Sequence, residues 1–185
     1  MGNALDVKKF LPINNVNLMN NLKIKSVLEN QKNFIINFSI ILFSFLVDRI
    51  SKLKIIEHQI DKEIIYINDF INFDLVWNTG IGFGLLSSAS SLFYNSITVL
   101  IGFVLIFLVY LINKSNSFDK ILFSLILGGA LGNFYDRVFY YAVPDFIDVH
   151  FKTFHWFTFN IADIFISLGI ISIIIKDLFI KNEKK

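Results

Sequence analysis

The chain has 185 residues and a net charge of only +2, so no strongly basic surface favours nucleic acid as a partner. It contains no cysteine, which excludes disulfides, zinc-thiolate sites and a thiol nucleophile. Hydrophobic residues make up 55% of the chain, and they lie in long blocks of the kind that a lipid solvent selects. The composition therefore predicts one compact domain of an integral membrane protein.

The chain begins with a polar stretch, residues 1–32, rich in asparagine and lysine and without a sustained apolar face. It predicts a flexible cytoplasmic extension. A membrane domain is predicted at 33–180, with a cytoplasmic tail at 181–185. Four apolar blocks of nearly spanning or spanning length follow the extension. They are Asn33–Ile50, Leu92–Ile112, a block that starts at Ile121 and is interrupted from Asn133 onward, and Phe157–Ile175.

A more polar stretch separates the first two blocks. Within it Phe73, Leu75 and Trp77 occupy alternate positions, which is the period of a half-buried strand. Ile64–Ile67 is a second candidate strand. A small sheet is predicted at about 60–86 outside the bilayer, because an open sheet edge cannot face lipid. The expected fold is mainly helical and polytopic, with four transmembrane helices and a small extracytoplasmic sheet between the first two.

The distribution of positive charge predicts the orientation. With the N-terminus inside, most of the 17 lysines and arginines fall on the extension, the loop Asn113–Lys120 and the tail. Such an excess favours the cytoplasmic side, so both termini are expected in the cytoplasm.

This topology gathers the unusual polar residues at the outer side of the membrane. A carboxylate inside a spanning helix is costly unless it faces water or a partner. Asp163, predicted a little below the start of the last helix, is therefore a functional candidate. The residues that converge are Asp48, Asn78, Asn133, Asp136, Arg137, Asp145 and Asp163.

Two helical motifs also have structural explanations. Asn160 and Asp163 are three residues apart, so they share a helix face, where they could join helices or interact with the helix dipole. The spacing of Gly128 and Gly132 predicts close helix packing.

The neighbouring residues Asp136 and Arg137 predict an ion pair that fixes the end of the third helix. Residues 78–84 are glycine-rich but lack the Gly-Lys-Ser/Thr ending of a phosphate loop, so they predict a turn that closes the sheet, with Asn78 as a polar contact.

The histidines predict no metal site. His58, His150 and His155 show no metal-ligand spacing such as His-Glu-x-x-His, and each is expected in a loop.

The candidates for catalysis reduce to carboxylates. No serine lies in a Gly-x-Ser-x-Gly elbow. Asp145 and Asp163 lie on opposite sides of a loop that could fold back. Two close carboxylates cannot both ionise easily, so one keeps a proton while the other acts as a base. Such a pair can activate water without a covalent intermediate.

Four strings, in this order, resemble the lipoprotein signal peptidase (signal peptidase II) family. They are Asn78-Thr79-Gly80, Gly128 to Arg137 (Gly-Gly-Ala-Leu-Gly-Asn-Phe-Tyr-Asp-Arg), Pro144 to Asp148 (Pro-Asp-Phe-Ile-Asp) and Phe159 to Asp163 (Phe-Asn-Ile-Ala-Asp). Asp48 followed by Lys52 is similar to the family's first-helix pattern. The resemblance extends from Phe34 to Phe179.

The resemblance implies an aspartic endopeptidase of the bacterial inner membrane that removes signal peptides from prolipoproteins, cleaving before a diacylglyceryl-modified cysteine. Membrane lipid is expected as a further partner, the protein is expected to be a monomer, and no cofactor is expected. The family's catalytic aspartates correspond to Asp145 and Asp163. Its supporting residues correspond to Asp48, Lys52, Asn78, Gly80, Gly129, Gly132, Asn133, Asp136, Arg137 and Asn160.

Three features depart from the family pattern: the extension at 1–32, Ile81-Gly82 in place of small residues, and Pro144 in place of an aliphatic residue. None removes a catalytic group. Two other classes stay open. A proton or ion pathway would need polar residues along the whole membrane depth. A non-enzymatic scaffold would not need two carboxylates at one face.

Overall fold

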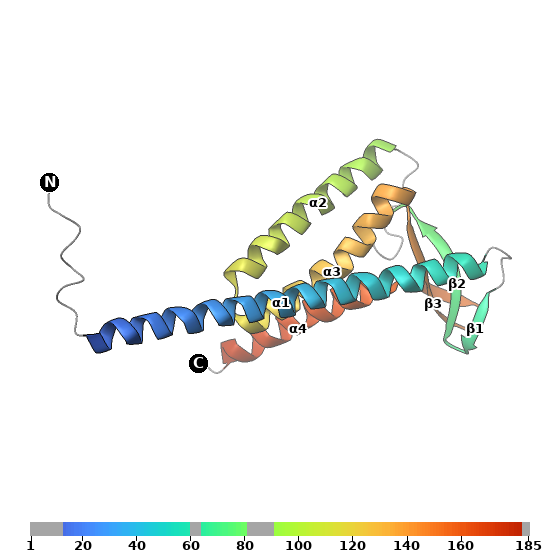
Figure 1. Ribbon diagram of the computed structural model, residues 1–185. Helices are drawn as coiled ribbons and strands as arrows, with labels where there is room; N and C mark the ends of the chain where they lie inside the picture. Colours follow the sequence, from blue (N-terminus) through green and yellow to red (C-terminus); the bar gives the residue numbers. More distant parts are fainter. Residues whose placement is uncertain (1–12, 60–63, 81–90, 183–185) are drawn as a thin grey trace. The chain divides into compact units, whose positions relative to one another are not determined.

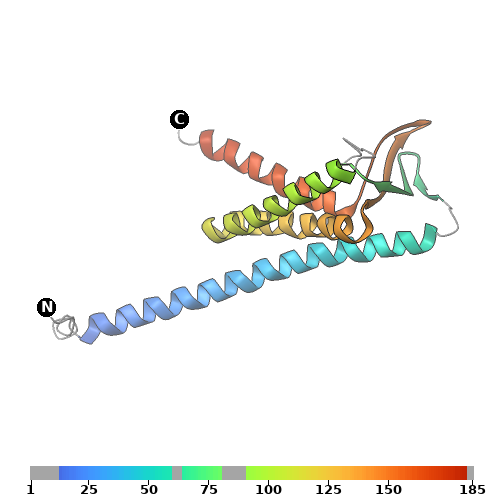
Figure 2. The ribbon, with the colours of Figure 1, turned by 90° about the horizontal axis from the view of Figure 1, so that it is seen from above.

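The computed structural model describes residues 13–59, 64–80 and 91–182, and these residues are mainly helical (Figures 1 and 2). The chain divides into two units, Met1–Ile36 and Asn37–Lys185. The helices are α1 (Ile13–His58), α2 (Ser91–Lys114), α3 (Ser117–Tyr140) and α4 (Ile161–Asn182).

Helix α1 begins at Ile13, well before the predicted start at Asn33. Pro12 stands just before this start, where proline is well tolerated, and residues 13–32 contain neither glycine nor proline to break a helix. The side chains of residues 20–32 are exposed in the structure. Because this part of the helix buries no face, its sequence needs no sustained apolar face that would have predicted it. Residues 1–12 lie outside the described part of the chain, and the cytoplasmic placement of the extension stays a prediction.

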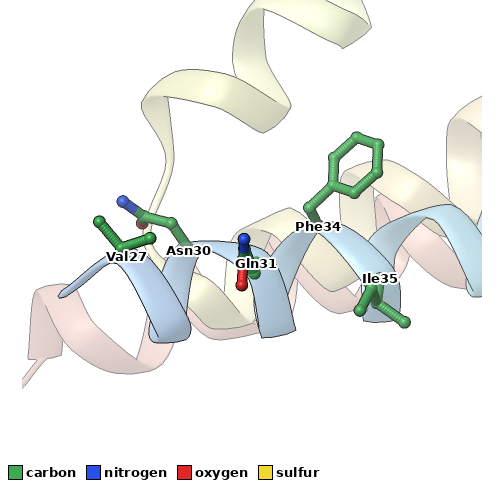
Figure 3. A pocket seen from close by; sticks show the side chains of 5 residues that line it. All are labelled: Val27, Asn30, Gln31, Phe34 and Ile35. Carbon is green, nitrogen blue, oxygen red and sulfur yellow. The ribbon is translucent and has the colours of Figure 1, made fainter. Parts of the chain in front are cut away.

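The first unit has a surface depression of about 520 Å³ (Figure 3). Val27, Asn30, Gln31, Phe34 and Ile35 line it, all from one stretch of α1. None of these side chains is titratable, and the depression suggests no chemistry.

Two of the helices in the described residues are long and apolar enough to cross a membrane, α1 within Asn20–His58 and α2 within Tyr94–Lys114. Their outward surfaces are strongly apolar. In α2, for example, Phe103 and Ile106 are 66% and 69% exposed. Contiguous apolar surface of this kind is rare in soluble monomers and fits a lipid environment.

The small sheet is antiparallel, with strand order β1-β2-β3-β4. It stands at one end of the helices of the second unit (Figures 1 and 2). The sequence predicts this sheet only between the first two helices, but the second half comes from the segment between α3 and α4. The strands are β1 (Ile65–Asn68), β2 (Ile71–Asn78), β3 (Val143–Phe151) and β4 (Phe154–Phe159).

The start of the last helix also differs from the prediction. The sequence places it near Phe157, but residues 154–159 form β4, and α4 begins at Ile161. The apolar run of this segment is equally compatible with a strand, and its β-branched and aromatic residues pair with β3. Asp163 consequently lies in the first turn of α4 rather than deeper along its axis.

Two apolar clusters hold the second unit together. Leu105, Leu108, Ile126 and Leu127 join α2 to α3, with residues of α4 packed against them. A second cluster, centred on Ile55, Phe146 and Ile147, fixes the sheet to the ends of α1 and α4.

The prediction that the glycines of α3 allow close helix packing is confirmed. A Cβ atom on Gly128 would lie 2.7 Å from the carbonyl oxygen of Ile41 in α1. One on Gly129 would lie 2.7 Å from the carbonyl oxygen of Ala162 in α4. Neither space admits a larger residue without movement of the backbone.

Candidate active site

Asp145 and Asp163 come from different elements but contact the same side chain, that of Asn160. The Asn160 Nδ2 group donates a hydrogen bond of 2.6 Å to Asp145 Oδ1. Asp163 N donates to Asn160 Oδ1 (3.1 Å), and Asn160 N donates to Asp163 Oδ2 (3.2 Å). This reciprocal pair is the pattern of a helix N-terminal capping box. Asn160 therefore starts α4 and also brings the carboxylate of β3 to its first turn.

The second oxygen of Asp145 is held by the predicted polar contact, Asn78. The Asn78 Nδ2 group donates to Asp145 Oδ2 (2.8 Å), and Gly80 N donates to Asn78 Oδ1 (2.8 Å). Both carboxylate oxygens thus accept a hydrogen bond from a buried amide. Asp145 is 2% exposed and Asn78 is 6% exposed.

A β-bulge places Asn78 beside Asp145. Between Phe73 and Val76, strand β2 has one residue more than β3, so the alternation of its side chains reverses. The predicted pattern of Phe73, Leu75 and Trp77 on one face consequently ends at the bulge. Trp77 is 43% exposed, while Asn78 turns inward.

Asp163 is held from α3 by Asn133. The Asn133 Nδ2 group donates to Asp163 Oδ1 (2.8 Å), and its Oδ1 accepts from Lys52 Nζ (2.8 Å). The same ammonium group donates to Asp48 Oδ2 and to Asp136 Oδ2, each at 2.7 Å. Two of these three hydrogen bonds connect α1 to α3, and the third, to Asp48, stays within α1. The Lys52 side chain is fully buried.

Four of the buried charged side chains form a cluster without net formal charge. Two carboxylates, Asp48 and Asp136, face two cations, Lys52 and Arg49, and Arg49 pairs directly with Asp136. Such pairing offsets the cost of removing charges from water. Asp48 also accepts a hydrogen bond of 2.9 Å from Ala162 N, which ties the cluster to the first turn of α4.

Sequence reasoning did not single out Arg49. Its guanidinium lies over the Tyr135 ring (4.6 Å to the centroid), and it donates to the Tyr140 hydroxyl (3.3 Å). The sequence did contain a signal for Arg49. Asp48 already has Lys52 as a partner in the same apolar helix, so a second cation, Arg49, needs a carboxylate from another element.

The predicted ion pair between Asp136 and Arg137 is wrong. Consecutive helical residues point in different directions, so the two side chains cannot face each other. Arg137 instead donates to the carbonyl oxygen of Gly80, and its own carbonyl accepts from the Tyr94 hydroxyl (3.0 Å). Its Nη1 atom is buried and has no hydrogen-bond partner among the described residues.

The small size of Gly132 is required by the same cluster. A Cβ atom at this position would collide with the carboxylate of Asp48. Gly129 and Gly132 therefore allow α4 and the Asp48 side chain, respectively, to approach α3.

A cavity of about 580 Å³ lies between α2, α3 and α4. Its charged or amide-bearing lining residues are Asn133, Arg137 and Asp163. Its other walls are almost entirely aliphatic, with residues such as Ile101 and Ile166. The arrangement offers an apolar chain a place next to a carboxylate.

The three histidines do not lie in loops. His58 ends α1, His150 lies in β3 and His155 lies in β4. Among the described residues, the hydrogen bonds of Asp145 and Asp163 involve none of these histidines.

The family model for signal peptidase (SPase) II matches residues 40–179. A lipoprotein signal peptidase of Pelagibacter ubique is 50% identical over 157 residues, which cover 84% of this chain and 95% of the relative. One of Francisella tularensis subsp. novicida is 40% identical over 121 residues, covering 63% and 75%.

The chain belongs to the signal peptidase II family.

Solved structures agree with this family membership. A bacterial membrane enzyme solved by the in meso method at 2.3 Å resolution has a TM-score of 0.64 and 34% identity, covering 80% of this chain and 91% of that one. Signal peptidase II enzymes form a family of aspartic peptidases, so this chain is an aspartic endopeptidase of the membrane. This result argues against the two alternatives left open by the sequence, a proton or ion pathway and a non-enzymatic scaffold.

The environment of Asp145 in this peptidase favours proton exchange near neutral pH. Burial of the side chain, followed by the negative charge of Asp163, raises the pKa of Asp145 from 3.8 to about 6. The hydrogen bonds from Asn78 and Asn160 act in the opposite direction and only partly offset the shift. A carboxyl group tuned in this way is typical of acid–base catalysis.

The raised pKa predicts a pH-dependent stability. Between about pH 4 and pH 6 the folded chain holds the Asp145 proton more tightly than the unfolded chain, so the free energy of unfolding falls as pH rises through this window. At about 1.4 kcal/mol per pKa unit, the loss is on the order of 3 kcal/mol. Asp145→Asn cannot titrate and should lack this component. Thermal unfolding of both proteins in one detergent, across this pH window, measures the difference.

The control for this experiment is Asp69→Asn, which removes a carboxylate from the exposed turn between β1 and β2. It should retain the pH dependence of the wild type. Parallel stability curves for the wild type and Asp145→Asn would contradict the raised pKa.

Proposed function

We propose that this peptidase removes signal peptides from diacylglyceryl-modified prolipoproteins, cutting just before the lipidated cysteine with water activated by Asp145 and Asp163. Removal of signal peptides from prolipoproteins is the activity of its family. The observation that carries the finer proposal is the position of the two carboxylates. Both carboxylates accept a hydrogen bond from Asn160, and Asp163 lines one part of an apolar cavity.

In the proposed reaction, one aspartate is protonated and the other ionised. The ionised carboxylate takes a proton from water, whose oxygen attacks the scissile carbonyl carbon. The protonated carboxyl group donates to the carbonyl oxygen as the tetrahedral intermediate forms. As the C–N bond breaks, a proton passes to the leaving amine. The two groups titrate as a pair, so neither role belongs to one aspartate at every stage.

The supporting residues position these groups rather than react. Asn78 and Asn160 orient Asp145, and Asn133 orients Asp163. Because each amide is itself fixed by a second hydrogen bond, the pair is pre-organised before substrate binds.

The cavity between α2, α3 and α4 suits the apolar part of the substrate. Its aliphatic walls match a signal-peptide segment or an acyl chain, while the buried guanidinium of Arg137 at the same cavity can donate to a substrate carbonyl. Two acyl chains anchor a substrate stably in a bilayer. This anchoring would hold the scissile bond at the depth of the aspartates and reduce the entropy lost in positioning it.

We further propose a monomer in the bacterial inner membrane, with four spanning helices, both termini in the cytoplasm and the active site near the outer face. The apolar helix surfaces support a position in the membrane, and the charge bias of the loops supports the orientation. Reporter fusions after Asn116 and Lys185 should read cytoplasmic, and one within residues 57–61 should read external. A cytoplasmic signal from the last fusion would overturn the orientation.

The proposed function is tested with a single precursor, prepared with and without its diacylglyceryl group. Purified enzyme should cleave the lipidated precursor much faster at equal concentration in the same detergent, because only the lipidated form is held at the depth of the aspartates. Mass spectrometry of the product should place the lipidated cysteine at the new N-terminus. Equal rates for the two precursors would show that the lipid plays no part in recognition.

A further inference from the structure

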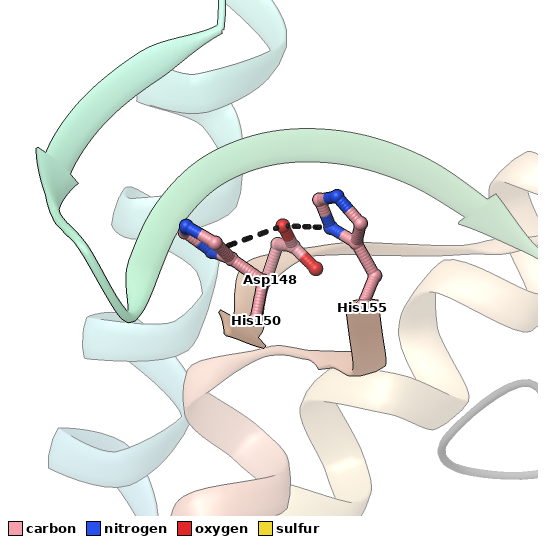
Figure 4. Close-up of side chains that lie close together, drawn as sticks. All are labelled: Asp148, His150 and His155. Atoms are coloured by element: carbon pink, nitrogen blue, oxygen red, sulfur yellow. Dashed lines mark hydrogen bonds and ion pairs between the residues drawn. The ribbon is translucent and has the colours of Figure 1, made fainter. Parts of the chain in front are cut away.

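We propose that Asp148, His150 and His155 form a binding site for a divalent transition-metal cation, with Zn²⁺ as the expected occupant. Each residue offers one ligand atom, and these atoms all lie within 4.8 Å of one another. Figure 4 shows the Asp148 carboxylate between the two imidazole rings, with an oxygen directed to a nitrogen of each. The cluster uses none of the groups assigned to peptide hydrolysis.

The β3–β4 hairpin assembles this cluster through a second bulge. Asp148 and His150 are two residues apart on β3, so they share a face of the strand. His150 pairs with His155 across the hairpin only because β4 has one extra residue, Trp156, at the register shift beside Val149. In a regular register without the bulge, His150 would lie opposite Trp156. Bulges of this kind re-aim side chains toward functional positions.

The geometry leaves a ligand atom available. Asp148 Oδ2 lies 2.7 Å from His155 Nδ1, but 3.6 Å from His150 Nδ1, which is too long for a hydrogen bond. His150 is 8% exposed, and its Nδ1 atom has no hydrogen-bond partner among the described residues. Buried polar atoms are normally satisfied, and a cation held between the carboxylate and both rings would satisfy this one.

The donor set selects the class of metal. Imidazole nitrogens favour zinc, copper or nickel, whereas magnesium and calcium prefer oxygen ligands. Two histidines and one carboxylate are a known three-ligand set for zinc, with the fourth position left for water. His155 is the accessible ligand, since its side chain is 58% exposed and can turn toward the ion. The buried Asp148 and His150 provide a fixed base.

A bound ion would cross-link the two strands of the hairpin. Strand β3 carries Asp145, and β4 leads directly into Asn160 and the first turn of α4. The expected consequence is a more stable hairpin around the active site. A hydrogen-bonded Asp148–His155 pair without metal is the competing explanation.

The test uses full-length enzyme without a polyhistidine tag, treated with chelator and dialysed in detergent. Titration with ZnCl₂ should reveal one tight site per chain by calorimetry and by metal analysis after dialysis. Zinc should also raise the thermal unfolding temperature, whereas MgCl₂ at the same concentration should not. His155→Gln and His150→Gln should each weaken zinc binding by roughly tenfold or more. The matched control is His58→Gln, at the exposed end of α1, and it should bind as the wild type does.

The exposed position of His155 keeps the test informative even if His150→Gln unfolds, because a ligand exposed at the surface can be replaced without disturbing the core. Equal zinc affinity in the wild type and His155→Gln would overturn the proposal. The proposal would also be overturned if His58→Gln lost zinc binding while His150→Gln and His155→Gln kept it.

Discussion

Asp145→Asn and Asp163→Asn are each expected to lower the rate of prolipoprotein cleavage by about 10³-fold or more, because general acid–base groups of this kind contribute on that scale. Asparagine nearly preserves the volume of the side chain, but it supplies neither a base nor a proton that titrates. The variants should fold, since Asn78, Asn133 and Asn160 can still form part of their hydrogen bonds. Cleavage of a lipidated precursor, measured beside thermal unfolding in the same detergent, separates lost chemistry from lost structure.

The matched control is Asp69→Asn, in the exposed turn between β1 and β2, which should cleave at the wild-type rate. Removing both aspartates together should cost little more than removing one, because residues that act as a unit are not additive. Substantial turnover by either single variant would contradict the assignment of the pair.

Lys52→Met is expected to lower the free energy of unfolding by about 3–5 kcal/mol, the cost of leaving buried charges without their partner. Lys52 donates to Asp48, Asn133 and Asp136, and its side chain is fully buried. Arg49 can compensate Asp136, but Asp48 would retain only its hydrogen bond from Ala162. Thermal unfolding in detergent measures the loss. Cleavage should fall as well, because Asn133 would no longer be fixed beside Asp163.

The control lies two residues along the same helix, where Lys54 is exposed. Lys54→Met removes the same charge and adds the same thioether, but it should change stability by less than about 0.5 kcal/mol. If both methionine variants were equally stable, the buried cluster would not hold the helices together.

Local sequence patterns predicted most of the helices and several residues of the candidate active site. Apolar blocks predicted the helices, since lipid requires long runs without charge. Asp163 was identifiable because a carboxylate beside an apolar segment is costly unless it faces water or a partner. Asn78 and Asn160 were recognised through the strings that contain them, and the structure places both against Asp145.

Other features depended on residues far apart in the chain. The period of two in β2 was visible, but the bulge after Phe73 was not, because a register shift is defined only against the partner strand. The helical or extended state of Phe157 was equally ambiguous, since a short apolar run fits both until β3 pairs with it.

The sequence by itself determined which polar groups this peptidase has and that they gather at one end of its helices. Only the tertiary structure decided which of them pair. Asp136 binds Arg49 and Lys52 of α1 rather than its neighbour Arg137, because adjacent helical side chains diverge while packed helices bring distant ones together. His150 and His155 likewise meet only across a bulged hairpin. Partner choice is a property of packing and register, and neither is encoded in local spacing.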